Sequence, residues 1–349
     1  MQNLLYKETD GLKYIMEQKE QSGRRDEFPE LVPNGSASFT HIFSEIEAFM
    51  NSKIHDHVVD GAAVAGDGML NDHGSGHIAM VMARAYMLVK DNVQDLKGYE
   101  IFFLLLSIHF HDVGNIYGRD AHEEKICSVF EALGDKFPLD STARRLITNI
   151  AMSHGGNHDG DKDTLAYVQE KEYVDGIAIR ASVLAALLRF ADEIADDKNR
   201  ASSVLVALKV IPKENKAFHE YSRSLEPPVI EADTLLLHYN IRNDLLFNRV
   251  SKLDSEVFLY DEILNRIQKC LCELDYCKRY SQGFIHVSCL SVRINILDSS
   301  ELKEIFQICF KAKITGYPDK SMYNPVCCSD PKVPAKTGEE LITLINKGN

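Results

Sequence analysis

The stretch Ile101–Asn115, IFFLLLSIHFHDVGN, decides how the rest of the chain is interpreted. It is a long apolar run that ends in a histidine, an aspartate and a glycine. The pattern predicts a buried helix over Tyr99–Asp112, which Gly114 terminates. Neighbouring side chains on a helix diverge by about 100°. His111 and Asp112 can therefore converge on one ion only where the helix ends.

An imidazole beside a carboxylate suits a divalent ion such as Mn, Fe, Co or Zn, with Mg also open. Upstream, His77 begins the amphipathic segment HIAMVMARAYML, and His73 stands just before it. Downstream, Asp192 lies in the apolar segment VLAALLRFADEI, where a buried carboxylate is costly unless it is paired or metal-bound. Two alternatives stay open. Asp192 can form a salt bridge with Arg189 or Arg200, and His73 can hydrogen-bond its own turn.

Helical periodicity extends on both sides of this stretch. Apolar residues recur at intervals of three and four from Ala37 to about Asp197. Helices enclosing a cluster of His and Asp indicate a functional site, whereas helices alone would indicate only a bundle. Besides Tyr99–Asp112, the predicted helices are Ser38–Val58, His77–Lys90, His122–Leu133, Ser141–His154 and Val174–Asp197.

The character of the chain changes after Arg200, where segments rich in Val, Ile, Leu and Tyr predict strands. These strands are Ser203–Ile211, Thr234–Arg242 and Phe284–Leu297, and the predicted helices are Ser255–Tyr280, Glu301–Phe310 and Gly338–Lys347. We expect the three strands to form one sheet covered by the longest helix. The fold class is therefore mainly α with a smaller C-terminal α+β appendage. The predicted divisions are an N-terminal helix and loop (1–36), a metal-binding helical domain (37–200) and the appendage (201–349).

The net charge and the length of the apolar runs limit the classes of partner that we expect. The net charge is −13, with 52 acidic and 39 basic residues, which opposes binding to extended nucleic acid. A small anionic ligand remains compatible, because a metal and a few arginines override the global charge locally. The apolar runs are shorter than a membrane span, and no signal-peptide core is present, so we expect a cytoplasmic protein without a membrane partner. Homo-oligomer formation stays open.

The eight cysteines show no C-x-x-C spacing and are expected to be reduced thiols. The weaker alternative is an irregular metal site at Cys270, Cys272 and Cys277.

The pattern H…HD…D resembles the HD superfamily of metal-dependent phosphohydrolases. Three segments carry the resemblance: DHGSGH, which ends at His77, HDVGN at His111 and Asp112, and LLRFADEI at Asp192. Together they span roughly residues 70–200. The resemblance implies a mostly helical fold, and it implies hydrolysis of phosphoester or phosphoanhydride bonds, usually in nucleotides.

Two further histidines resemble those of two-metal members, such as cyclic-dinucleotide phosphodiesterases and a group of diadenosine-tetraphosphate hydrolases. By this resemblance, His122 and His154 complete a dinuclear site in which Asp112 bridges both ions, and Asp112 and His122 are catalytic. In the one-metal alternative, the two histidines act as a general acid or contact phosphate. His158 is an alternative to His154. The implied ligand set is His77, His111, Asp112, His122, His154 and Asp192.

Cations near these motifs are expected to bind substrate phosphates, because the planar guanidinium group binds two oxygens at once. The candidates are Arg119, Arg189, Lys198 and Arg200, each with a solvated or capping role as the alternative. The chain lacks the acidic pair of alarmone hydrolases, and residues 70–200, which carry the resemblance, contain no G-Y-P signature of cyclic-di-GMP phosphodiesterases. The remaining alternatives are a dNTP triphosphohydrolase-like enzyme, an antiphage-defence nucleotide hydrolase or sensor, and a diiron oxygenase resembling myo-inositol oxygenase.

Overall fold

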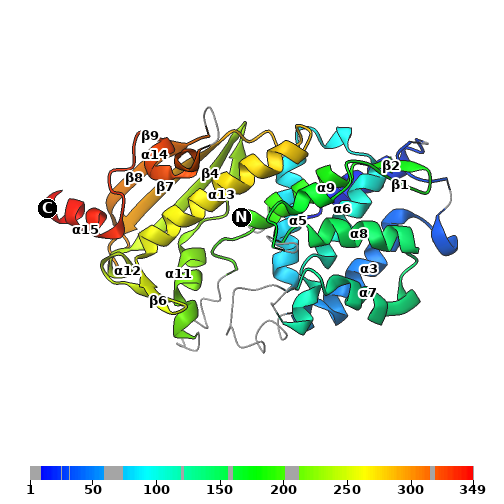
Figure 1. Cartoon of the computed structure of the whole chain (residues 1–349), viewed down its shortest axis with the longest axis horizontal. Coiled ribbons are helices and arrows are strands. Elements are labelled where there is room, and N and C mark those ends of the chain that lie inside the picture. The colour runs from blue at the N-terminus through cyan, green and yellow to red at the C-terminus, as the bar shows by residue number, and fades with distance from the viewer. Residues whose placement is uncertain are drawn as a thin grey trace. The chain divides into compact units, whose positions relative to one another are not determined.

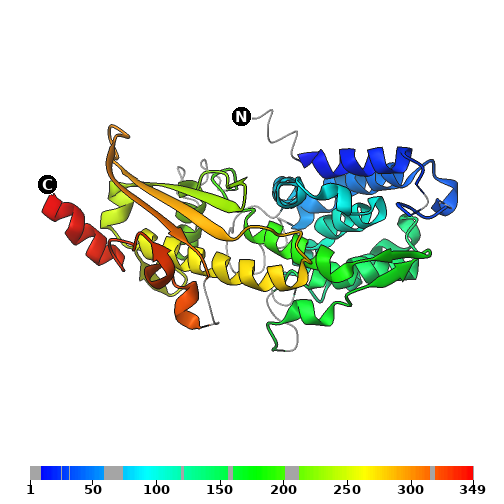
Figure 2. The same ribbon diagram turned by 90° about the horizontal axis from the view of Figure 1, so that it is seen from above.

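The computed structural model describes residues 9–24, 26–30, 32–58, 74–118, 122–155, 160–200, 212–314 and 319–348. The chain forms two compact units, which are drawn in Figures 1 and 2. The helical unit comprises Met1–Asp67, His73–Ala195 and Cys277–Ile285, and the mixed unit comprises Gly68–Asp72, Asp196–Tyr276 and His286–Asn349. The predicted fold class, mainly α with a smaller α+β part, is confirmed. Among the described residues, no helix is both long enough and apolar enough to cross a membrane.

One fully buried helix lies at the centre of the helical unit. Every residue of α6 (Gly98–Phe110) is buried, which explains the uninterrupted apolar run in its sequence. The helices packed against it are α2 (Gly11–Gln21), α3 (Phe39–Lys53), α5 (Ser75–Val89), α8 (Ser141–Met152) and α9 (Ala181–Glu193). The short helix α7 (Ile126–Leu133) packs on α8. The N-terminal helix α2 is thus part of the helical unit and packs on its central helix.

A buried ion pair joins the beginnings of α6 and α9. Glu100 is fully buried and accepts hydrogen bonds from Nε and Nη2 of Arg180 at 2.8 and 2.6 Å, and from the backbone N–H of Arg180 at 3.0 Å. It also caps α6 by accepting from the backbone N–H of Lys97 at 2.9 Å. A buried carboxylate is stable only when its oxygens are satisfied in this way. This pair therefore aligns two helices that both carry predicted metal ligands.

A β-hairpin stands where the sequence analysis predicted the first part of a helix over Val174–Asp197. Strands β1 (Glu172–Val174) and β2 (Ile177–Ile179) are antiparallel. The turn residues Asp175 and Gly176 have φ values of 50° and 81°, as a two-residue hairpin turn requires. The prediction was therefore wrong before Ala181, where α9 begins. The other predicted helices of this unit are present, with ends shifted by up to five residues.

The mixed unit is built on a five-stranded sheet of order β3-β4-β7-β8-β9. Strands β4 and β7 are parallel, and the other neighbours are antiparallel. The helix α13 (Leu259–Tyr280) lies along one face of this sheet in both views (Figures 1 and 2). Alternate residues of β4, such as Leu235 and Tyr239, are buried. The strands are β3 (Val229–Glu231), β4 (Thr234–Arg242), β7 (Cys289–Leu297), β8 (Glu304–Ala312) and β9 (Ser329–Asp330).

Smaller elements complete the two units. In the mixed unit these are α11 (Lys216–Ser224), α12 (Asn243–Phe247), α13 (Leu259–Tyr280), α14 (Pro325–Cys328), α15 (Gly338–Gly348) and the hairpin β5 (Val250–Lys252) with β6 (Ser255–Val257). The 3-10 helices are η1 (Pro33–Gly35), η2 (Val93–Asp95), η3 (Val113–Tyr117), η4 (Gly134–Lys136), η5 (Thr164–Tyr167), η6 (Lys213–Asn215) and η7 (Lys320–Tyr323). All eight cysteines are free thiols, as expected.

Strand β8 corrects the prediction of a helix over Glu301–Phe310. Its residues pair in register with β7, and Ile308, Phe310 and Ala312 are buried at every second position. A short apolar run fits a helix or a strand by pattern alone, so only pairing with β7 settles the question. The prediction for Thr234–Arg242 is confirmed as β4. Strand β7 begins five residues later than predicted, α13 begins four residues later, and the predicted strand Ser203–Ile211 lies outside the described residues.

Removing the cation from the buried pair tests its contribution. We expect Arg180→Ala to lower the free energy of unfolding by about 3–5 kcal/mol, because the Glu100 carboxylate then stays buried without a partner. The control is Glu45→Ala, which removes an exposed ion pair with His41 and should cost less than about 1 kcal/mol. Urea unfolding followed by circular dichroism measures both values.

The same pair predicts a dependence on pH. Burial alone would raise the pKa of Glu100, but hydrogen bonds from Arg180 and Lys97 hold it below its ordinary value. A lowered pKa in the folded state stabilises at neutral pH, and that stabilisation is lost as the pH falls through the folded pKa. The difference in the free energy of unfolding between the wild type and Arg180→Ala should therefore become smaller in acid. Equal stability of the two proteins at pH 7 would contradict this role.

Candidate metal centre

The side chains of the candidate centre come from helix ends in the helical unit. His77 lies in the first turn of α5, His111 directly follows α6, and Asp192 lies in the last turn of α9. His154 follows α8 by two residues, and Asp112 precedes the 3-10 helix η3. Side chains at helix ends can converge on one point because the chain changes direction there. The structure thus brings the predicted ligands together.

One oxygen of Asp112 faces the first group of ligands. Its Oδ2 lies 3.4 Å from Nε2 of His111 and 3.7 Å from Nε2 of His77. Oδ1 of Asp192 lies 3.0 Å from Nε2 of His77 and 3.8 Å from Nε2 of His111. The Nε2 atoms of His77 and His111 thus both lie within 4 Å of a carboxylate oxygen of Asp112 and of Asp192.

The other oxygen of Asp112 faces a second group. Its Oδ1 lies 3.3 Å from Nε2 of His122 and 3.7 Å from Nε2 of His154. The ligand atoms of Asp112, His122 and His154 all lie within 4.8 Å of one another, as do those of His77, His111 and Asp112 and those of His111, His154 and Asp192. The two oxygens of Asp112 thus lie near different imidazoles, which would allow this carboxylate to bridge two ions.

Backbone carbonyls orient two of the imidazoles. Nδ1 of His111 lies 2.7 Å from the carbonyl oxygen of Ile108, and Nδ1 of His154 lies 2.5 Å from that of Ala151. A carbonyl only accepts hydrogen bonds, so Nδ1 carries the proton in each ring, and a neutral ring then has its Nε2 lone pair facing the cluster. Proteins commonly fix metal-binding histidines in this way.

The charges of the cluster fit a bound cation. Burial opposes a charge on His111, but Asp112 and Asp192 outweigh it and raise its pKa to about 9. Burial and the neighbouring His111 lower the pKa of His154 to about 4. Nε2 of His111 is buried and has no hydrogen-bond partner among the described residues. Four imidazoles and two carboxylates with such a nitrogen are a donor set that one or two divalent transition ions satisfy.

Two further residues support Asp112 and His122, and the sequence analysis missed both. The amide Nδ2 of Asn115 donates to Oδ1 of Asp112 at 3.0 Å, and Oε2 of Glu123 lies 3.3 Å from Nδ1 of His122. A polar residue three positions after Asp112 and a carboxylate directly after His122 are the sequence signals that could have identified them. Such outer groups orient metal ligands and tune their basicity.

Gly114 was predicted to terminate the central helix, but it lies beyond the end of that helix. Helix α6 already ends at Phe110, and Gly114 lies inside η3. A Cβ atom at this position would lie 1.8 Å from the backbone carbonyl oxygen of His122. The missing side chain therefore lets the backbone of His122 approach the turn that follows Asp112.

Arg189 was expected to contact phosphate, and the structure places its side chain in hydrogen bonds inside the helical unit. The residue is buried, and its Nη1 donates to the carbonyl oxygen of Gly155 at 3.0 Å and to Oγ1 of Thr164 at 2.7 Å. Thr164 in turn donates to the carbonyl oxygen of Ser153 at 2.8 Å. These bonds fasten the segment that carries His154 to α9, the helix of Asp192.

Two other predicted phosphate ligands, Lys198 and Arg200, belong to the mixed unit. Lys198 forms an ion pair with Glu226, and the backbone N–H of Arg200 donates to the carbonyl oxygen of Asp197 at 3.0 Å, all within the mixed unit. Arg119, His73 and His158 lie outside the described residues.

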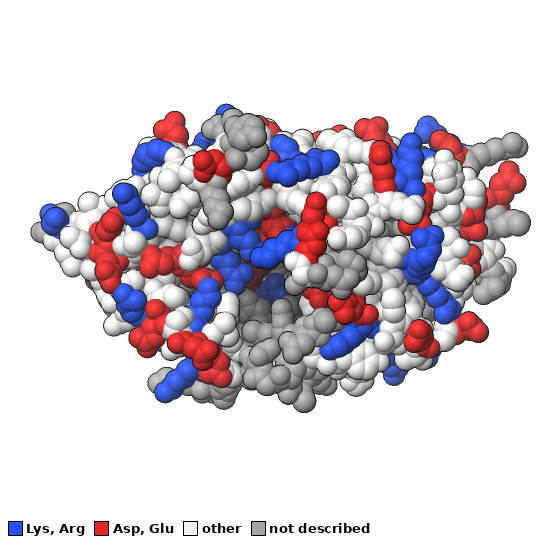
Figure 3. All heavy atoms as spheres, viewed as in Figure 1, with Lys and Arg blue, Asp and Glu red and all other residues white. Residues whose placement is uncertain are grey.

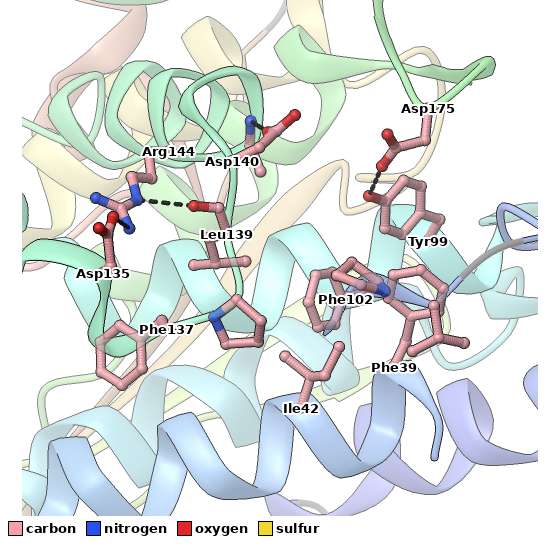
Figure 4. A pocket seen from close by; sticks show the side chains of 14 residues that line it. Phe39, Ile42, Tyr99, Phe102, Asp135, Phe137, Leu139, Asp140, Arg144 and Asp175 are labelled. Atoms are coloured by element: carbon pink, nitrogen blue, oxygen red, sulfur yellow. Dashed lines mark hydrogen bonds and ion pairs between the residues drawn. The ribbon is translucent and has the colours of Figure 1, made fainter. Parts of the chain in front are cut away.

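A cavity of about 450 Å³ in the helical unit is separate from this centre. In Figure 4, Tyr99 points toward Asp175, to which its hydroxyl donates at 2.9 Å, and Arg144 donates to the carbonyl of Leu139 at 2.8 Å. Tyr99 lies in the first turn of α6, whereas His111 follows its last turn. Twelve residues of helix separate the two by about 18 Å. The cavity therefore lies near the opposite end of the central helix from the metal ligands.

Metal content tests the division of the ligands. Loaded with Mn, Fe, Co or Zn, the protein should bind one to two ions per chain, and Asp112→Ala should lose most of the bound metal because it removes the shared carboxylate. His122→Ala should lose about one ion. Elemental analysis after removal of free metal measures these values, with Asp26→Ala as the exposed-aspartate control. A wild type that binds no ion would contradict the whole assignment.

Arg189→Met tests the link between α9 and the segment of His154. We expect this variant to stay folded and to keep the ion held by His77, His111 and Asp192, while its affinity for the second ion falls roughly tenfold or more, because His154 is then less firmly placed. Competition with a chelator measures the two affinities. Equal weakening of both sites would indicate a general loss of stability instead.

Comparison with known proteins agrees with this geometry. The HD-CE family model matches residues 67–271, which is more than half of the chain and includes all six candidate ligands. No curated protein and no solved structure matches the chain. The family match and the His/Asp cluster together indicate a metal-dependent hydrolase of the HD type. The chain belongs to the HD-CE family, and its resemblance to the HD superfamily is confirmed.

Proposed function

We propose that this protein is a metal-dependent phosphohydrolase that cleaves a phosphoester or phosphoanhydride bond of a nucleotide. The observation that carries the proposal is the division of the Asp112 carboxylate, whose two oxygens face separate sets of imidazoles. Bound divalent ions supply an activated water and neutralise the charge that develops on a departing phosphate oxygen. Phosphoryl transfer needs both of these contributions.

The protein's own groups hold the reaction partners in place. We assign the first ion position to His77, His111 and Asp192, the second to His122 and His154, and the bridge to Asp112. The Glu123 carboxylate lies beside Nδ1 of His122 and thereby orients the His122 ring. If only the first position is filled, His122 is available to donate a proton to the leaving oxygen, as a general acid.

A small anionic substrate suits the charge of the chain. Acidic and basic side chains are interspersed over the face shown in Figure 3, in a chain with 52 acidic and 39 basic residues. Extended nucleic acid requires many cations in a row, whereas a nucleotide needs only a few near its phosphates. We retain Arg119 as a proposed phosphate ligand, and we propose a cytoplasmic location.

A substrate screen tests the proposal. Protein loaded separately with Mn, Fe, Co and Zn is incubated with dNTPs, NTPs, dinucleoside polyphosphates and cyclic nucleotides, and the products are separated by chromatography. We expect hydrolysis of at least one class, and we expect His77→Ala and Asp192→Ala to abolish it while Asp26→Ala retains it.

The other outcomes separate the alternatives. Oxygen uptake by the iron-loaded protein without hydrolysis would favour the diiron oxygenase. Nucleotide binding without turnover would favour a sensor.

A further inference from the structure

The sheet of the mixed unit has one face that α13 does not cover. Residues of β4 and β7 alternate between the face that packs on α13 and this second face, which carries His238 and Arg293. A cavity of about 340 Å³ lies on the second face, lined among others by His238, Ser291, Arg293 and Lys311. Pockets for small ligands begin at about 300 Å³. The size of the cavity therefore suits a small molecule.

The strand register gathers cationic side chains at this cavity. His238 of β4 is the direct partner of Arg293 on β7, and Lys311 of β8 is the direct partner of Ser291 on β7. Arg293 and Lys311 are diagonal neighbours on the same face, because Arg293 pairs with Cys309, two residues before Lys311. Side chains of this length reach the same space from diagonal positions.

Within the part of the chain that the structure describes, no ion pair neutralises these cations. Arg293 and Lys311 are exposed, and neither forms an ion pair or a side-chain hydrogen bond with the described residues. Of the described residues that line the cavity, Asp330 is the acidic one, and it pairs with Lys311 through the backbone register. Arg293 stands directly opposite His238 and Cys309, so no acidic residue is its direct strand partner. The chain carries a net charge of −13, so a cavity lined by two cations differs in charge from the protein as a whole.

We propose that this face of the sheet binds a small phosphate-bearing ligand at a site that is separate from the metal centre. The guanidinium of Arg293 donates two parallel hydrogen bonds to phosphate oxygens, and Lys311 and Ser291 donate to the remaining oxygens. Ring nitrogens of His238 supply a further donor. Two permanent cations match one or two phosphate groups and not the repeated phosphates of a nucleic acid, whose affinity grows with each phosphate neutralised.

Isothermal titration of the full-length wild type in EDTA tests the site, because the chelator removes the ions through which the metal centre would hold phosphate. The probes are pyrophosphate, AMP, ATP and a single-stranded oligonucleotide. We expect binding of pyrophosphate or ATP, weakened roughly tenfold or more by Arg293→Gln and by Lys311→Gln, because each removes a charge-assisted hydrogen bond. Arg293→Lys should retain part of the affinity. Lys303→Gln, an exposed lysine outside the cavity, is the matched control and should bind as the wild type does.

The outcomes are distinguishable. Similar affinities for pyrophosphate and ATP support the site and assign it to free phosphates, whereas tighter binding of ATP supports it and assigns it to a nucleotide. Absence of binding by the wild type overturns the proposal, as does equal affinity of both Gln variants and the control. Binding that strengthens with oligonucleotide length overturns it in favour of nucleic acid. None of these results depends on hydrolysis at the metal centre.

Discussion

The Asp112 carboxylate is a charge held inside a helical bundle, and the helical unit is organised around that constraint. The residue is 6 % exposed and follows a helix that is buried at every position. An uncompensated charge in such a place costs several kcal/mol. Compensation comes from imidazoles grouped on each oxygen, which reach it from the ends of different helices. A divalent ion at either position would complete that compensation.

Links away from the ligands keep these helix ends in register. Glu100 and Arg180 join α6 to α9 at their beginnings, while Arg189 joins α9 to the segment that carries His154. Gly114 allows the His122 backbone to approach the turn after Asp112. Bound ions tolerate only small errors in ligand position, so the Arg189 bonds and the close approach at Gly114 support the centre although neither residue faces an ion position.

In the mixed unit, the two faces of the sheet differ in composition. Its sheet buries one face under α13 and leaves the polar residues of alternate positions on the other face. The fold requires only that the covered face be apolar, so the composition of the open face is free to serve binding. Arg293 and Lys311 lie exposed on the open face and form no ion pair with the described residues. A bound phosphate-bearing ligand, as we propose, would neutralise them.

The sequence by itself predicted the helical class, and its resemblance to the HD superfamily implied the six side chains of the candidate centre. The cost of a carboxylate in apolar surroundings pointed independently to Asp192. It also contained the Asp175–Gly176 hairpin signal, which the longer helical periodicity obscured. It could not decide whether Glu301–Phe310 is a helix or a strand, since a short apolar run fits both. Only the tertiary structure decided that Arg189 fastens a ligand-bearing segment and that Asp112 divides its oxygens between two sets of ligands. Both depend on distances between residues far apart in the chain, and local periodicity carries no information about such distances.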